Sequence, residues 1–196
     1  MRLTSFSRLH HSALQVTITL LVGWSAASFL TLNLHSSRIA RAPKKAPPGA
    51  KCLEGWMTYK ECCYGFFTEM ETWWDAEEKC RYSPAARTHL ASILDDEEMD
   101  AVANFITPLN QEYNNYTHPV WIGLYNQWLG KSEERNWWWM DSFKTVYVAW
   151  ARGEPNNADT WENCVTLLPR KGYKKWNDDN CIKRFPYLCK YELKYQ

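Results

Sequence analysis

The stretch GEPNNADTWENC, Gly153–Cys164, gathers three carboxylates and three side-chain amides around a single proline. A second polar cluster, KWNDDNC, follows at Lys175–Cys181 and also ends in a cysteine. Asn, Asp, Pro and Gly commonly make turns, so either cluster alone could be only a turn. If Cys164 and Cys181 pair, however, the bond holds the two clusters side by side. They would then form two walls of one site.

The side chains of the two clusters suit a hard cation. Calcium takes about six to eight oxygen ligands from carboxylates, amides and backbone carbonyls. With the Asp178 backbone carbonyl, the candidate set supplies six protein oxygens and leaves two positions for neighbouring sugar hydroxyls. Acids and amides together let each hydroxyl both donate and accept, and Pro155 permits a cis peptide bond that turns its neighbours toward one point. The candidate calcium and carbohydrate ligands are Glu154, Asn156, Glu162, Asn177 and Asp178.

Charge is distributed unevenly along the 196 residues, although the net charge is only +1. Residues 1–51 hold seven Lys/Arg and no acid, whereas residues 52–196 hold 16 basic and 22 acidic residues, a net charge of −6. An acidic main domain is a poor partner for a phosphate backbone. We therefore expect no nucleic-acid binding.

The N-terminus has the pattern of a targeting segment. An apolar run begins at Ala13, and Ser25 and Ala27 fit the small-x-small rule for signal cleavage. Because apolar residues continue to about residue 34, the alternative is an uncleaved signal anchor and a type II membrane protein. We predict a secreted, extracellular protein with a signal peptide at 1–27, a basic Pro/Ala-rich linker at 28–51 and one domain at 52–196.

All seven cysteines lie in the predicted domain, after Lys51. They cluster near both ends of that domain, which suits disulfides that tie the termini together. Such bonds persist in an oxidising compartment. The cysteine pattern therefore agrees with the predicted export of the chain.

The order of predicted elements indicates an α+β fold. Thr72 can cap a helix in TWWDAEEKC, and Asp95 with Glu98 can form a capping box for a second helix, which Pro108 is expected to end. After these helices the pattern changes to short β-type segments separated by polar turns. Strands are predicted in VWIGLY (120–125), RNWWWM (135–140), VYVAW (146–150), NCVTLL (163–168) and FPYLCKY (185–191).

These segments together resemble the C-type lectin-like domain family over nearly all of residues 52–190. The matching motifs, in order, are CLEGWMTYKECCYGFF, WWDAEEKC, HLASI, VWIGL, WWWMDS, GEPNN, ENCV, WNDDNC and FPYLCKY. The resemblance implies a C-type lectin-like fold with two helices, short antiparallel sheets and a calcium-binding long loop. The chain is similar to the secreted venom-lectin and regenerating-protein branches. The implied disulfides are Cys52–Cys63, Cys80–Cys189 and Cys164–Cys181.

The resemblance also implies a function. It assigns the five ligands named above to the principal calcium site, and the EPN and WND motifs imply mannose-type sugars: mannose, N-acetylglucosamine and fucose. Asn157 and Asn163 replace acids common in members with a second calcium site. The implied protein is a lectin for glycans on glycoproteins or cell surfaces, and not an enzyme. The alternative is a secreted protein-binding effector that contacts a receptor or haemostatic target independently of sugar.

Other residues have their own alternatives. Cys62 is the odd cysteine, and it either links a disulfide-bonded homodimer or stays free. Asn115 begins the sequon NYT and is a predicted glycosylation site. His89 and His118 invite a zinc or catalytic interpretation, which we disfavour because the cysteines have structural partners.

Overall fold

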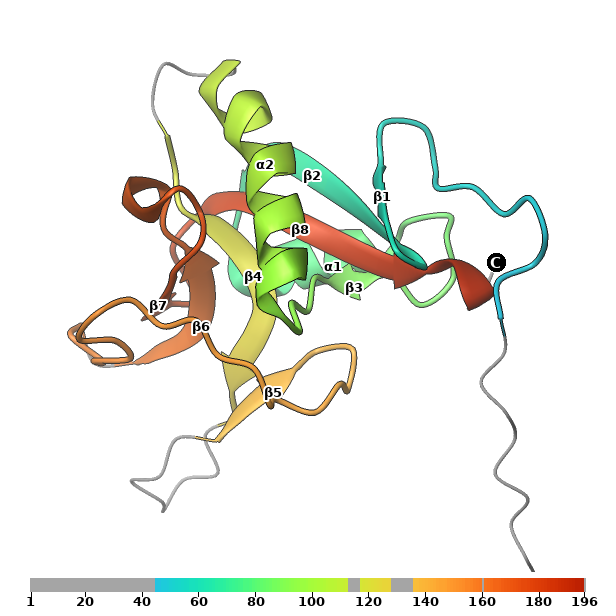
Figure 1. Cartoon of the computed structure of the whole chain (residues 1–196). Coiled ribbons are helices and arrows are strands. Elements are labelled where there is room, and N and C mark those ends of the chain that lie inside the picture. The colour runs from blue at the N-terminus through green and yellow to red at the C-terminus, as the bar shows by residue number, and fades with distance from the viewer. Residues whose placement is uncertain (1–44, 113–116, 128–135, 160, 196) are drawn as a thin grey trace, which may run out of the picture. The chain divides into compact units, whose positions relative to one another are not determined.

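The central strands are β2 (Cys62–Glu71) and β8 (Phe185–Glu192), which pair antiparallel. The computed structural model describes residues 45–112, 117–127, 136–159 and 161–195. Within these ranges the strands form one sheet in the order β1-β2-β8-β4-β6-β7, with β3 paired to β8 and β5 paired to β4 (Figure 1). The remaining strands are β1 (Met57–Tyr59), β3 (His89–Leu90), β4 (Val120–Asn126), β5 (Trp137–Trp139), β6 (Glu162–Leu167) and β7 (Trp176–Asn180).

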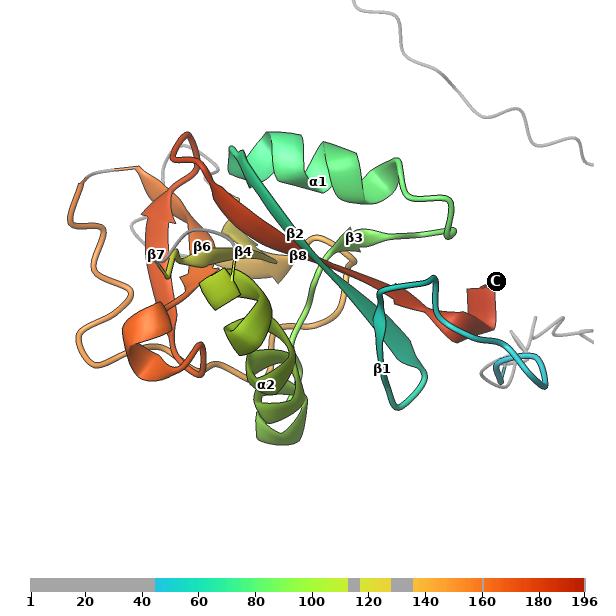
Figure 2. The same cartoon turned by 90° about the horizontal axis from the view of Figure 1, so that it is seen from above.

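The two helices lie on opposite faces of the β2–β8 pair (Figures 1 and 2). Helix α1 (Trp73–Arg81) begins after Thr72, whose hydroxyl accepts a hydrogen bond from the Asp75 N–H at 3.3 Å. The predicted cap is therefore confirmed. Short 3-10 turns follow β6 and β8, η1 (Pro169–Lys171) and η2 (Leu193–Tyr195). Together these elements confirm the α+β class.

Helix α2 (Asp96–Glu112) runs past Pro108, so the prediction that Pro108 ends it was wrong. A proline inside a helix removes one backbone hydrogen bond. Beyond it, the buried Asn110 amide donates to the His118 carbonyl at 3.0 Å and to the Tyr173 hydroxyl at 2.7 Å. These tertiary bonds hold the last turn of the helix against the rest of the domain.

The start of α2 is only partly as predicted. Asp95 Oδ1 accepts a hydrogen bond from the Glu98 N–H at 2.6 Å, which confirms the cap. The reciprocal half of the capping box was wrong, because Glu98 Oε2 accepts from the Leu94 N–H at 2.8 Å. Its other oxygen accepts from the Tyr64 hydroxyl and from Lys190 Nζ, which lies at 2.6 Å. Glu98 is recruited by Lys190, since a buried ammonium needs a counter-charge.

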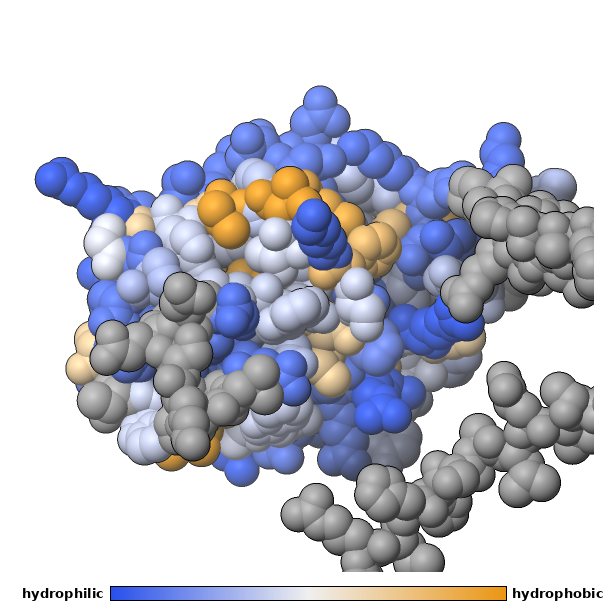
Figure 3. Space-filling model, turned by 90° about the horizontal axis from the view of Figure 1, so that it is seen from below, coloured by the Kyte–Doolittle hydropathy of each residue, from blue (hydrophilic) through white to orange (hydrophobic). Residues whose placement is uncertain are grey.

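Two predicted segments take other conformations. VYVAW (146–150) is extended but makes only an isolated bridge, from Trp150 to Trp176, so the predicted strand was wrong. Val146 and Val148 are 78% and 51% exposed, and the view from below shows apolar residues gathered on part of a mostly polar face (Figure 3). WNDDN, expected to be a loop wall, forms β7.

Disulfides and tryptophans hold the domain together. All three implied disulfides are present, Cys52–Cys63, Cys80–Cys189 and Cys164–Cys181. Trp73, Trp121 and Trp176 are fully buried, and the Trp73 indole donates to the Ile122 carbonyl at 2.8 Å. This bond satisfies the indole N–H of Trp73 inside the core.

The predicted signal peptide at 1–27 and the Asn115 sequon lie outside the described residues. Within the described ranges, no helix has the length and apolarity needed to cross a bilayer. The last residues of the predicted linker contact the domain, because Ala46 and Ala50 pack against a buried cluster that includes Cys63 and Leu193.

Candidate functional site

The side chains of the first polar cluster form hydrogen bonds with the cluster's own backbone. The Glu154–Pro155 peptide bond is cis, as the sequence allowed. Asn156 Oδ1 and Glu162 Oε2 accept the Ala158 N–H at 2.7 and 2.6 Å. The Glu162 N–H in turn donates to Asn157 Oδ1 at 3.0 Å. The polar residues therefore satisfy the backbone of a loop that has few apolar contacts.

The second polar cluster lies beside this loop because β7 pairs with β6. Asp178 is fully buried, and its two carboxylate oxygens accept the N–H groups of Asn156 and Asn157 at 3.0 and 2.9 Å. The Cys164–Cys181 disulfide joins β6 to the residue that follows β7. The two clusters therefore lie side by side, as the sequence analysis expected.

Asn177 is hydrogen-bonded to its own neighbour on β7. Its amide donates to the carbonyl oxygen of Asp178 at 2.5 Å, which is the carbonyl counted above as a sixth ligand. On β7 it pairs in register with Thr166 of β6. The structure therefore brings Asn156 and Asp178 into direct contact and leaves Asn177 turned toward its own neighbour.

Burial and nearby carboxylates raise the pKa of two glutamates of the site. Burial raises the pKa of Glu154 above its usual range, and the nearby charges of Asp178 and Glu162 raise it further. Burial also raises the pKa of Glu162, with Asp178 again contributing. Like charges held close together disfavour ionisation. The site is therefore a concentration of negative charge that a cation would relieve.

One oxygen of the site has no partner. Glu154 Oε2 is buried and accepts no hydrogen bond from the described residues, although a buried polar atom normally has one. Across the ranges that the structure describes, no three His, Cys, Asp or Glu side chains stand in the arrangement that a metal ion needs. The donor chemistry nevertheless fits a hard cation, since it consists of carboxylate and amide oxygens with one buried oxygen to spare.

Two neighbouring residues of the first cluster have left-handed backbone conformations. Asn157 has a positive φ of 52° and its amide oxygen caps the Glu162 N–H. Asparagine is enriched in this left-handed conformation, so its position after Pro155 was an available signal. Trp161 has φ of 83° and is 61% exposed beside Glu162. Such strain in a bulky residue is typical of functional loops.

Comparisons with known proteins give the family. A family model described as the lectin C-type domain matches residues 69–191. The chain belongs to the C-type lectin family. It is 41% identical to a C-type lectin of Thrasops jacksonii, one of the lectoxins, over 143 residues, covering 72% of this chain and 84% of that protein.

Solved structures agree. This C-type lectin matches human lithostathine at 30% identity and a TM-score of 0.62, covering 72% of this chain and 99% of that one. It also matches the cow C-type carbohydrate-recognition domain of CD23, solved in the presence of GlcNAc2Man3 oligosaccharide, at 30% identity and a TM-score of 0.58, covering 73% and 97%. The predicted branches, venom lectins and regenerating proteins, are thus represented among its relatives.

Family membership makes this protein a non-enzymatic lectin. The histidines have structural surroundings in this C-type lectin. His89 Nδ1 lies 2.7 Å from Glu77 Oε1, and the Leu90 N–H donates to the other oxygen of Glu77 at 2.8 Å. Glu77 thereby fastens α1 to β3.

Proposed function

We propose that this C-type lectin is a secreted protein that binds mannose-type sugars with a calcium ion held by Glu154, Asn156, Glu162, Asn177 and Asp178. The observation that carries the proposal is the buried Glu154 Oε2, which has no hydrogen-bond partner among the described residues. Burial and the charge of Asp178 also raise the pKa of both Glu154 and Glu162. Such an arrangement gains most from a divalent cation.

The side chains have separate tasks in this proposal. Calcium, when bound, supplies open coordination positions for two neighbouring hydroxyl oxygens. Glu154 and Glu162 accept the hydroxyl protons, whereas the Asn156 and Asn177 amides donate to hydroxyl lone pairs. Asp178 holds the loop through the two N–H groups it already accepts. The directions of these hydrogen bonds select the hydroxyl geometry.

Two further observations support the proposal. The CD23 domain that this chain resembles was solved with an oligosaccharide of N-acetylglucosamine and mannose, and the lectoxin relative carries the name of a C-type lectin. Three disulfides suit an extracellular setting. The sugar contacts one exposed loop and one strand, so single-site affinity should be weak and useful binding should need clustered glycans.

A pulldown on mannan-agarose tests the proposal. We expect the protein to be retained in calcium, released by EDTA and released by free mannose. Asn156→Ala should abolish retention because it removes one ligand and one donor. Asn104→Ala is the matched control, since Asn104 is an exposed residue of α2 far along the chain from the site.

Two results would contradict the proposal. Retention that persists in EDTA would favour the sugar-independent protein-binding alternative. Equal loss of retention in both asparagine variants would show that the resin reports general damage to the domain.

A glycosylated Asn115 would be an independent mark of secretion, read by mass spectrometry of protein from a eukaryotic host.

A further inference from the structure

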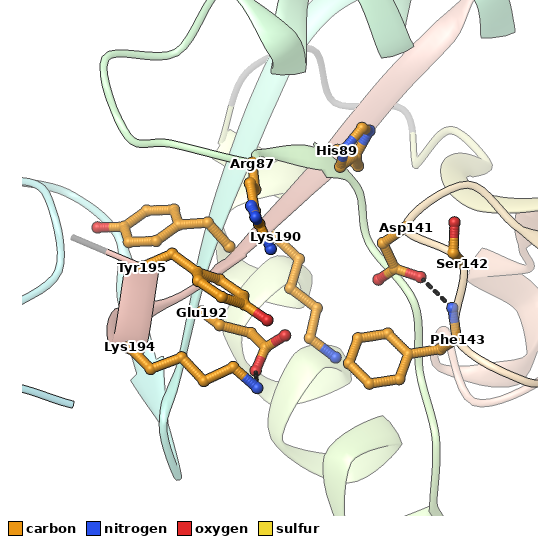
Figure 4. Close-up of a pocket in the computed structure, with 10 residues that line it drawn as sticks. Arg87, His89, Asp141, Ser142, Phe143, Lys190, Glu192, Lys194 and Tyr195 are labelled. Carbon is orange, nitrogen blue, oxygen red and sulfur yellow. Dashed lines mark hydrogen bonds and ion pairs between the residues drawn. The ribbon is translucent and has the colours of Figure 1, made fainter. Parts of the chain in front are cut away.

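A pocket of about 460 Å³ lies apart from the proposed calcium site and shares no residue with it. Its walls come from the segment before β3, the turn at 141–143 after β5, and the end of β8 with η2. This volume lies within the usual range for small-molecule sites, about 300–1,000 Å³. Figure 4 shows Arg87, Lys190 and Asp141 turned toward the same space.

Arg87 is the unusual cation of this pocket. Its guanidinium lies 4.2 Å from the centroid of the Tyr195 ring. Arg87 is exposed, and no ion pair or hydrogen bond joins it to another of the described residues. A guanidinium that stacks by its face keeps its N–H edge available for a planar oxyanion. Arg87 also has a positive φ of 57°, which only a few per cent of residues other than glycine adopt.

The two lysines of the pocket are already neutralised. Lys190 Nζ lies 2.6 Å from Glu98 Oε1 and is only 3% exposed. Lys194 Nζ lies 2.5 Å from Glu192 Oε2. These two ion pairs hold the floor and one wall of the pocket in place, and neither of them involves Arg87. Among the described residues of the pocket, Arg87 is therefore the cation that an incoming anion meets without a paired carboxylate.

The pocket wall formed by the 141–143 turn presents a hydrogen-bond acceptor, the Asp141 carboxylate. Asp141 accepts hydrogen bonds from the Ser92 hydroxyl at 2.5 Å and from the Phe143 N–H at 3.3 Å. Burial raises the pKa of Asp141, so its carboxylate gains from an additional donor. The Phe143 ring lies beside it and offers an apolar face to the pocket.

We propose that this pocket binds a small, ring-shaped, hydroxylated anion, an acidic monosaccharide, with its carboxylate or sulfate on Arg87 and its hydroxyls on Asp141. Arg87 supplies a bidentate charge-assisted contact. Asp141 accepts from hydroxyl protons, and the Tyr195 and Phe143 rings contact the apolar face of the sugar ring. A neutral sugar lacks the group for Arg87, and an apolar ligand would leave both charges unpaired.

The test is a titration of the full secreted chain, labelled with ¹⁵N, in EDTA. The probes are glucuronate, glucose 6-sulfate and glucose. We expect millimolar glucuronate or glucose 6-sulfate to shift the Arg87 Nε–H signal and the Phe143 amide signal, and glucose to leave both unchanged. Binding of glucuronate alone identifies the carboxylate, binding of the sulfate alone identifies the sulfate, and binding of both identifies a general oxyanion site.

Single-residue variants test whether Arg87 is the residue that binds the anion. Arg87→Gln should weaken anion binding about tenfold or more, the usual loss when a charge-assisted hydrogen bond is removed. Arg87→Lys keeps the charge without the fork and should retain part of the affinity. Arg81→Gln is the matched control, an exposed arginine of α1 that does not line the pocket.

Several results would overturn the proposal. They are the absence of shifts with both anions, equal shifts with glucose, or equal affinity in Arg87→Gln and Arg81→Gln. Because the titration runs in EDTA, failure of the calcium-site proposal would not affect it. Near-ultraviolet circular dichroism, which reports packing of the buried tryptophans, establishes that each variant is folded.

Discussion

Replacing Glu154 with glutamine should stabilise the calcium-free domain and weaken its response to calcium. The pKa of Glu154 is raised by burial and by Asp178 and Glu162. The folded domain therefore binds a proton more readily than the unfolded chain, whose glutamates have a pKa of about 4.3. It follows that the free energy of unfolding falls as pH rises toward and through the folded-state pKa. A neutral glutamine removes this cost at neutral pH.

The expected magnitude follows from the size of the domain. About 145 residues give an unfolding entropy of roughly 0.3 kcal/mol per degree, so 1 kcal/mol corresponds to about 3 °C in Tm. The glutamine would exchange a like-charge contact for a hydrogen-bond donor, a net gain of about 1 kcal/mol. In EDTA at neutral pH the variant should therefore melt about 3 °C above the wild type. This advantage should shrink as pH falls toward about 4.3.

Calcium should reverse the order of the two melting temperatures, those of the wild type and of the Glu154→Gln variant. A ligand at about 100 times its Kd stabilises the folded state by about 2.7 kcal/mol, which is about 9 °C for this domain. The Glu154→Gln variant loses one charged ligand, so its calcium-induced rise in Tm should be less than half as large. The wild type should then melt at the higher temperature.

Differential scanning calorimetry with and without calcium measures both effects. The matched control is Glu97→Gln, because the Glu97 side chain is 82% exposed on α2 and, among the described residues, pairs only with Lys60. This control should keep the full calcium response. The reasoning is refuted if Glu154→Gln keeps that response, or if the variant melts below the wild type in EDTA at neutral pH.

Three further predictions concern other parts of the molecule. The double change Glu154→Gln with Asn156→Asp should move sugar preference from mannose toward galactose by exchanging donors and acceptors, and a glycan array that still favours mannose would count against the mechanism. Gly123→Ala should lower Tm by about 6 °C or more, a loss of at least about 2 kcal/mol, because its Cβ would lie 2.3 Å from a backbone oxygen of β3, and calorimetry measures it. If the predicted homodimer forms through Cys62, Cys62→Ser should remove it from a non-reducing gel, and formation should be slow because burial raises the pKa of the Cys62 thiol. A dimer that survives Cys62→Ser would refute the linkage.

Elements with strong local signals were predictable from the sequence. Thr72 begins α1 because its hydroxyl satisfies a free helix N–H, an interaction within four residues. Tertiary contacts decided the failures. Pro108 lies inside α2 because Asn110 is fixed by Tyr173, 63 residues further along the chain. The side chains of VYVAW (146–150) alternate in burial, as those of a strand do. Within the described ranges, however, the segment pairs with a neighbouring strand only through one isolated bridge.

The two sites differ in how far the sequence could predict them. The EPN and WND motifs name the residue types of the calcium site, and a disulfide between neighbouring strands explains why they meet. The sequence could not say that Asp178 would accept the N–H groups of the opposite loop. Arg87 and Asp141 belong to no motif and lie 54 positions apart. Only the fold brings them to one pocket.

The two sites should also differ in stiffness, because they are supported differently. The loop at residues 156–159 is exposed and is held by polar hydrogen bonds that calcium ligands would share. The pocket floor is Lys190, a buried residue of β8 whose ion pair with Glu98 joins the strand to α2. Regions with few apolar contacts open at low free energy, whereas core strands exchange only near global unfolding. Chelation of calcium should therefore speed amide hydrogen exchange in the 156–159 loop and leave β8 unchanged. Equal acceleration in both would mean that the sites are coupled through the sheet, and acidic-sugar binding would then depend on calcium after all.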